Sequence, residues 1–147
     1  MCDSSSEDAA ESALMRILIV WPDTAPGRMI AKLLGEYGSC DWVTDTKAAL
    51  QFFAAALSDQ PYGLVAIDCR LPGMDGFAAL GMLREQETAA ESLLQRSTVC
   101  LLSADDEQVL RYELRYGPDQ GTYCLTDPLN LDALEVIAKI ARTRCRR

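Results

Sequence analysis

The sequence has 147 residues, of which 49% are hydrophobic and 24% charged, so it is long enough to bury a core as one globular domain. The formal net charge of −8 argues against binding to nucleic acid or anionic lipid, because both are polyanions. The chain has no signal-peptide pattern, no apolar run of membrane-spanning length, no histidine and no CxxC pair among its six cysteines. These features predict a reduced, cytoplasmic protein without a zinc site.

The first fourteen residues differ in composition from the rest of the chain. Residues 1–14 are rich in Ser, Glu, Asp and Ala and show neither strand periodicity nor strong helical periodicity. They predict a flexible acidic tail, and residues 15–147 predict the folded domain. The apolar run 17–20 then indicates a strand that is covered on both faces.

From this strand onward, short apolar runs alternate with segments of helical spacing. The predicted strands are 17–20, 41–43, 63–67, 98–102 and 122–125. The predicted helices run from Pro26 to Gly38, from a cap within Thr44-Asp45-Thr46 to Leu57, over 77–83, from Val109 to Gly117, and from an N-cap at Asn130 to Ala141. The connection 85–96 either extends the third helix or forms a surface loop. This alternation predicts an α/β fold, a flavodoxin-like doubly wound (βα)5 unit with a five-stranded parallel sheet in the order 2-1-3-4-5.

Polar side chains follow the strands at the edge where such sheets bind ligands. Asp23 comes after the first strand, and Asp68 and Arg70 come after the third. Ser103 follows the fourth strand and Asp127 the fifth. The predicted site therefore gathers carboxylates and one hydroxyl but no lysine.

The segment 64–76, Leu-Val-Ala-Ile-Asp-Cys-Arg-Leu-Pro-Gly-Met-Asp-Gly, resembles the phosphoacceptor strand and loop of the receiver domains of two-component response regulators. Leu102-Ser103-Ala104 resembles the hydroxyl motif that follows the fourth strand in this family. Residues 121–134 resemble its fifth strand and the start of its last helix. The resemblance covers residues 15 to 141, which is essentially the whole folded part.

The resemblance implies a role for each matched residue. Asp68 corresponds to the phosphoacceptor, whose side chain attacks a phosphoryl donor, and Ser103 corresponds to the switch hydroxyl. A magnesium ion offsets the transferred charge in this family, and its ligands are carboxylates, a backbone carbonyl and water. On this basis Asp23, Asp68 and the carbonyl of Arg70 are the candidate metal ligands.

The sequence departs from the family pattern at several positions. Trp21 and Pro22 stand where receivers have an acidic pair, so Asp23 lies one residue too late. Asp127 replaces the usual lysine, and Cys124 stands at the usual aromatic position, with Tyr123 facing the other way. Two unit charges about 4 Å apart interact by roughly 4 kcal/mol at an effective dielectric near 20, so this charge reversal opposes a phosphoryl group on Asp68.

Two functions remain open after these departures. The favoured hypothesis is a pseudo-receiver, an interaction module with weak or absent magnesium binding, no other cofactor and at most weak self-phosphorylation, hence no enzyme. The second is an atypical but working receiver that takes a phosphoryl group from a histidine kinase at Asp68.

Single residues of the site also have alternative interpretations. Asp68 could be a plain strand-end residue. Arg70 either forms an ion pair with Asp68 or Asp127, or its side chain is solvated. A flavin protein or another enzyme is disfavoured, because no phosphate-binding loop follows the first strand.

The fourth helix carries the predicted interaction face. Tyr112 and Tyr116 are four residues apart, with Arg111 and Arg115 beside them. The resemblance implies that this side of the domain binds a signalling protein, either a histidine kinase or an output domain, with the protein as a monomer or a homodimer. Exposed aromatic residues beside arginine suit such a face, although a helical stripe of this kind packs against a sheet more often.

Overall fold

The structure is a computed structural model that describes residues 15–90, 96–116, 121–126 and 129–145, excluding the side chains at positions 103, 104, 115 and 116. In these ranges strands and helices alternate regularly. The strands are β1 (Arg16–Val20), β2 (Ser39–Val43), β3 (Tyr62–Asp68), β4 (Thr98–Ala104) and β5 (Thr122–Thr126). The helices are α2 (Thr24–Leu34), α3 (Thr46–Leu57), α4 (Gly76–Ala89), α5 (Asp106–Tyr116) and α6 (Leu131–Cys145).

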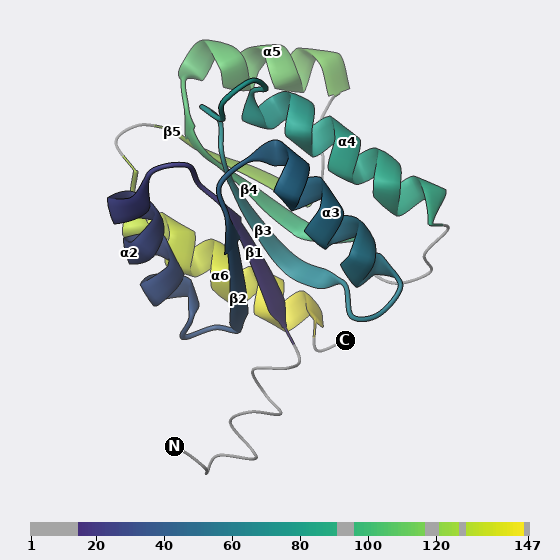
Figure 1. Ribbon diagram of the computed structural model, residues 1–147. Coiled ribbons are helices and arrows are strands. Elements are labelled where there is room, and N and C mark those ends of the chain that lie inside the picture. The colour runs from purple at the N-terminus through teal and green to yellow at the C-terminus, as the bar shows by residue number, and fades with distance from the viewer. Residues whose placement is uncertain (1–14, 91–95, 117–120, 127–128, 146–147) are drawn as a thin grey trace.

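The five strands form one parallel sheet in the order β2-β1-β3-β4-β5, which confirms the predicted doubly wound fold. Helices α2 and α6 cover one face of the sheet, whereas α3 and α4 cover the other and α5 lies beside α4 (Figure 1). Because parallel strands all point the same way, their carboxyl ends meet at one edge. Asp68 ends β3 at this edge.

Two hydrophobic cores lie on opposite faces of the sheet, because successive side chains of a strand point to opposite faces. The core beneath α3 and α4 includes Leu18, Val20, Phe53, Val65, Ile67, Leu80 and Leu101. The core beneath α2 and α6 includes Ile17, Ile19, Ile30, Leu64, Ala66, Leu102 and Ile137. Cys124 packs against the first core and Tyr123 against the second, as the alternation along β5 predicts.

Polar caps fix the starts of several helices. The Asp45 carboxylate accepts a hydrogen bond from the Ala48 amide at 2.8 Å, and the Asn130 side chain accepts from the Asp132 and Ala133 amides. Asp45 is the cap within the predicted segment 44–46, and Asn130 is the predicted N-cap. Both side chains satisfy amides that lack a partner within the first turn.

Some element boundaries differ from the predicted ones. Helix α2 begins at Thr24, before Pro26. Proline is tolerated at this place because the N–H groups in the first turn of a helix have no carbonyl partner within the helix. Strand β3 extends to Asp68 itself. Helix α4 continues to Ala89, so the connection after Glu85 is partly helical.

The predicted acidic tail, residues 1–14, lies outside the described residues. Within the described residues, no helix is both long and apolar enough to cross a membrane. The five described cysteines are free thiols (Cys40, Cys69, Cys100, Cys124 and Cys145).

Candidate functional site

The candidate site is built around the carboxylate of Asp68. Strand β3 runs through both cores and ends at Asp68, whose residue is only 2% exposed. One of its oxygens, Oδ1, accepts a hydrogen bond from the Arg70 backbone amide at 3.1 Å. The strand end and the following turn therefore hold the carboxylate in one orientation.

Arg70 provides a counter-charge from the same turn. Its Nε lies 3.7 Å from Asp68 Oδ1, while its side chain remains 64% exposed. Burial raises the pKa of the Asp68 carboxyl above its ordinary value; the Arg70 amide and guanidinium oppose this shift, and the nearby Asp23 carboxylate adds to it. Burial is the largest cause, so Arg70 offsets the cost of the buried charge only in part.

The end of β1 brings a large apolar side chain to the position beside Asp68. Val20 pairs with Ile67 in the sheet, so Trp21 and Asp68 follow at neighbouring positions on the two strands. Trp21 is 3% exposed and packs in the core beneath α2 and α6. Its carbonyl accepts a hydrogen bond from Trp42 Nε1 at 2.9 Å. Trp21 is thus a packing residue, and its side chain offers no oxygen to a cation.

Asp23 lies on the exposed side of the site. It is the N-cap residue of α2, but its side chain makes no capping hydrogen bond. The described residues contain no group of three Asp, Glu, Cys or His side chains that could hold a metal ion. Of the candidate ligands, the structure brings Asp23 and Asp68 near enough to interact electrostatically.

Two further candidates cannot be placed by their side chains. Ser103 belongs to β4, which puts its backbone at the same edge of the sheet, but its side chain lies outside the described residues. Asp127 lies outside them altogether, directly after the exposed Thr126 that ends β5. Their roles therefore stay predictions.

The turn between Asp68 and α4 requires two glycines. Gly73 has a φ of +78°, a conformation that side chains with a Cβ disfavour. Gly76 lies against the backbone of the strand end: a Cβ there would come within 2.8 Å of Cys69 Cα and 2.9 Å of the Asp68 carbonyl oxygen. Its amide donates to the Cys69 carbonyl at 3.0 Å, so the first turn of α4 rests directly on the site.

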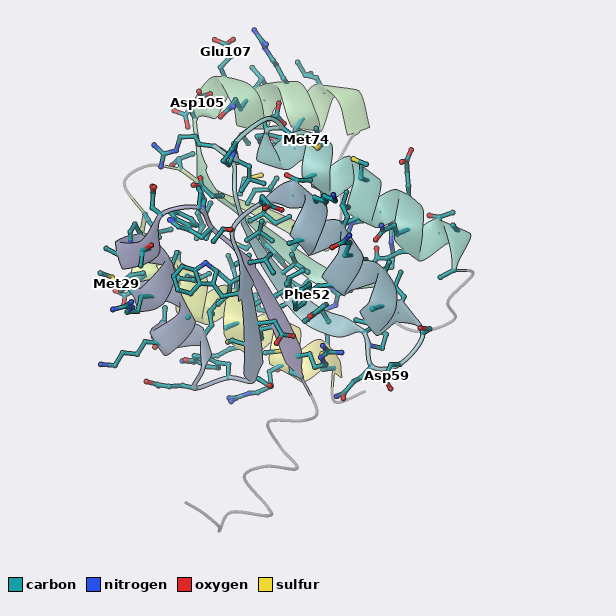
Figure 2. The ribbon with its side chains drawn as sticks, in the orientation of Figure 1. Met29, Phe52, Asp59, Met74, Asp105 and Glu107 are labelled. Atoms are coloured by element: carbon teal, nitrogen blue, oxygen red, sulfur yellow. The ribbon has the colours of Figure 1, made fainter. Side chains whose placement is uncertain are left out.

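The predicted interaction face lies on α5, where the Glu107 side chain projects away from the sheet (Figure 2). Arg111 is exposed and pairs with Glu107, whereas Tyr112 turns inward and packs against Phe77. The side chains of Arg115 and Tyr116 lie outside the described residues. Sequence reasoning assigned Leu110 and Leu114 to the helix but missed their exposure, which is 55% and 78%. Their spacing of four residues places them on one face of the helix but does not tell whether that face is covered.

Comparisons with known proteins agree with this geometry. No protein-family model matches the chain. The transcriptional regulatory protein QseB of Escherichia coli O157:H7 is 37% identical over 107 residues, which cover 71% of this chain and 44% of QseB. The receiver domain of Francisella response regulator 1452 superimposes with a TM-score of 0.67 at 25% identity, covering 88% of this chain and 98% of that one. The chain is a response-regulator receiver domain.

Two further proteins are similar to this receiver domain, one by its structure and one by its sequence. The BeF3-activated DrrB receiver domain matches with a TM-score of 0.64 at 22% identity, over 86% of this chain and 96% of that chain. The QseB of Haemophilus influenzae is 33% identical over 101 residues, or 63% of this chain and 44% of that protein. The receiver domain thus spans less than half the length of both QseB proteins.

Proposed function

We propose that this receiver domain is a pseudo-receiver, an interaction module in two-component signalling that takes little or no phosphoryl group on Asp68. The observation that carries the proposal is the end of β1, where the buried Trp21 and then Pro22 replace oxygen ligands beside Asp68. Magnesium prefers several oxygen ligands in an octahedral arrangement, and neither the indole of Trp21 nor the ring of Pro22 supplies a side-chain oxygen.

Charge at the site supports the same proposal. A phosphoryl group on Asp68 would add nearly two negative charges close to Asp23. In the sequence, Asp127 brings a further negative charge where receivers carry a lysine. The cation placed at the site by the described residues is Arg70, whose Nε lies 3.7 Å from Asp68. Arg70 already serves as the counter-charge of the unmodified carboxylate.

The partner of the module is a signalling protein that docks on α5. Leu110 and Leu114 form an exposed apolar pair on this helix, and Arg111 and Glu107 lie beside it. Apolar anchors next to charged residues are typical of protein interfaces. The acidic composition and the absence of a basic patch on the described part of α5 disfavour nucleic acid as the ligand of this domain.

A working receiver is the second candidate, and the position of Asp68 favours it. The carboxylate ends β3 at the ligand-binding edge of the sheet and is followed by the glycine-containing turn described above. Two structures with the same fold bear on this alternative. A yeast receiver was solved with the histidine phosphotransfer protein Ypd1, and a Pseudomonas aeruginosa receiver was solved with magnesium in its cleft.

Intact mass after incubation with acetyl phosphate and magnesium separates the two candidates. We expect no phosphate-sized gain in the wild-type protein. A gain that disappears in Asp68→Asn would overturn the pseudo-receiver proposal in favour of the working receiver. Folding of each protein is confirmed by circular dichroism, so that an absent gain reports on the site.

A gain-of-function variant makes the experiment sharper. Pro22→Asp combined with Asp127→Lys restores an acid and a cation at the edge without disturbing the buried Trp21. If the missing groups are the cause, this double variant should gain phosphate on Asp68. The matched control combines Pro22→Asp with Asp59→Lys, which makes the same net charge change but places the lysine at an exposed position before β3, at the other end of the strand from Asp68, and it should gain nothing (Figure 2).

A further inference from the structure

Helix α5 is the least buried helix among the described residues. No side chain at positions 106–114 is buried, whereas α2 buries three residues, α3 and α6 four each, and α4 five. Helices with little buried surface open at a low free-energy cost. The position of α5 therefore depends on a small number of contacts.

One of these contacts is a pair of aromatic rings between α5 and α4. The rings of Tyr112 and Phe77 lie with centroids 5.4 Å apart and planes tilted by 42°. Both residues, with Val109 of α5, pack at the border of the core beneath α3 and α4. At this border β5 contributes the half-buried Cys124, which is too small to form a comparable contact.

Phe77 stands close in the chain to the site. It is the second residue of α4, whose first residue, Gly76, lies against the backbone of Asp68 and Cys69. The Asp75 carboxylate caps this helix by accepting from the Ala78 amide at 2.8 Å. Gly76 rests on the backbone of the strand end and Phe77 follows it directly in the chain, so a change in the turn after Asp68 reaches the residue that bears this ring first.

We propose that the Phe77–Tyr112 ring pair is a latch that couples the Asp68 turn to the position of α5. Tyr112 and Phe77 are positioning residues in this scheme, since neither contacts a phosphoryl group or a partner. The latch rests on the proposed function only in its assumption that α5 is the docking face. It needs no phosphorylation, because any change in the charge or bonding of Asp68 acts through the same turn.

Amide hydrogen exchange of the full chain tests the latch without a partner or a phosphoryl donor. Asp68→Asn loses the ion pair with Arg70. We expect the α5 amides of this variant to exchange about 2- to 10-fold faster than those of the wild-type protein. This is the range of rates that loss of one aromatic pair would give. Tyr112→Leu should accelerate the same amides. In the Tyr112→Leu background, Asp68→Asn should then have no further effect on α5.

Two control variants separate coupling from simple loss of packing. Tyr112→Phe keeps the ring and should retain the response of α5 to Asp68→Asn. Leu114→Ala alters an exposed side chain on the same helix and should also retain it. The latch is excluded if Asp68→Asn leaves α5 unchanged in the wild-type background, or if its effect on α5 survives in Tyr112→Leu. The mass experiment measures phosphate on Asp68 rather than exchange in α5, so the latch and the proposed function can fail independently.

Discussion

Asp68 carries a charge that its surroundings only partly compensate. Its residue is 2% exposed, its Oδ1 accepts from one backbone amide, and the guanidinium of Arg70 stays largely in solvent. A carboxylate in such a place is more costly to ionise than one in water. The folded domain therefore retains an unfavourably placed charge at its site even without a ligand.

This charge makes stability depend on pH in a definite direction. Because the pKa of Asp68 is raised in the folded state, mainly by burial, the unfolded chain ionises first as pH rises. Between about pH 3.9, the ordinary Asp pKa, and the higher folded-state pKa, the free energy of unfolding that Asp68 contributes decreases as the pH rises. Asp68→Asn should therefore be more stable than wild type at pH 7, and this advantage should fade near pH 4.

Urea unfolding of both proteins at pH 7 and pH 4 measures this difference. The control is Asp59→Asn, which removes an exposed carboxylate and should leave the free energy of unfolding nearly unchanged. If Asp68→Asn is instead less stable at pH 7, the pair with Arg70 outweighs burial and the sign assigned to the pKa shift is wrong.

Helix α2 shows how one element is fixed by a close approach. Gly27 lies against the Trp42 indole of β2, and a Cβ at this position would come within 2.4 Å of the ring. The indole is itself held by its hydrogen bond to the Trp21 carbonyl, so it cannot easily move away. The glycine thus positions the helix that follows Asp23, at the border of the site.

Gly27→Ala should consequently destabilise the domain by about 1–3 kcal/mol through overpacking. Gly81→Ala is the matched control, because a Cβ there meets no atom within 4 Å and the change replaces a poor helix former. It should stabilise the protein by about 0.5–1 kcal/mol. Urea unfolding of the two variants checks both signs, and equal effects would mean that the Trp42 contact does not constrain α2.

At the scale of the whole molecule, the arrangement of strands was predictable because buried parallel strands leave uninterrupted apolar runs such as 63–67 and 98–102. Trp21 was predictable as a packing residue from its apolar side chain. The approach of Arg70 to Asp68 was one of several alternatives, since a long exposed side chain has many rotamers that sequence does not rank. The exposure of Leu110 and Leu114 was missed because their periodicity is the same for a packed and an exposed helix face.

The ends of the strands opposite the site are joined by a buried carboxylate that no motif in the sequence singles out. Glu87 of α4 is 7% exposed and accepts hydrogen bonds from the Arg84 guanidinium at 2.8 Å and from the Ser97 amide at 2.8 Å. Arg96 adds a weaker contact at 3.4 Å. The same Arg84 side chain reaches the Ser97 carbonyl and the Thr122 hydroxyl, so the network ties α4 to the starts of β4 and β5.

Glu87→Ala should destabilise the domain by about 3 kcal/mol, because it leaves the poorly exposed Arg84 guanidinium without its carboxylate partner. Glu87→Gln keeps an acceptor for one of the two bonds and should lose less. Glu85→Ala, at an exposed position two residues earlier, should stay within about 0.5 kcal/mol of wild type. Urea unfolding ranks the three variants; if Glu87→Ala matched Glu85→Ala, packing alone would hold α4 to the sheet and the network would be dispensable.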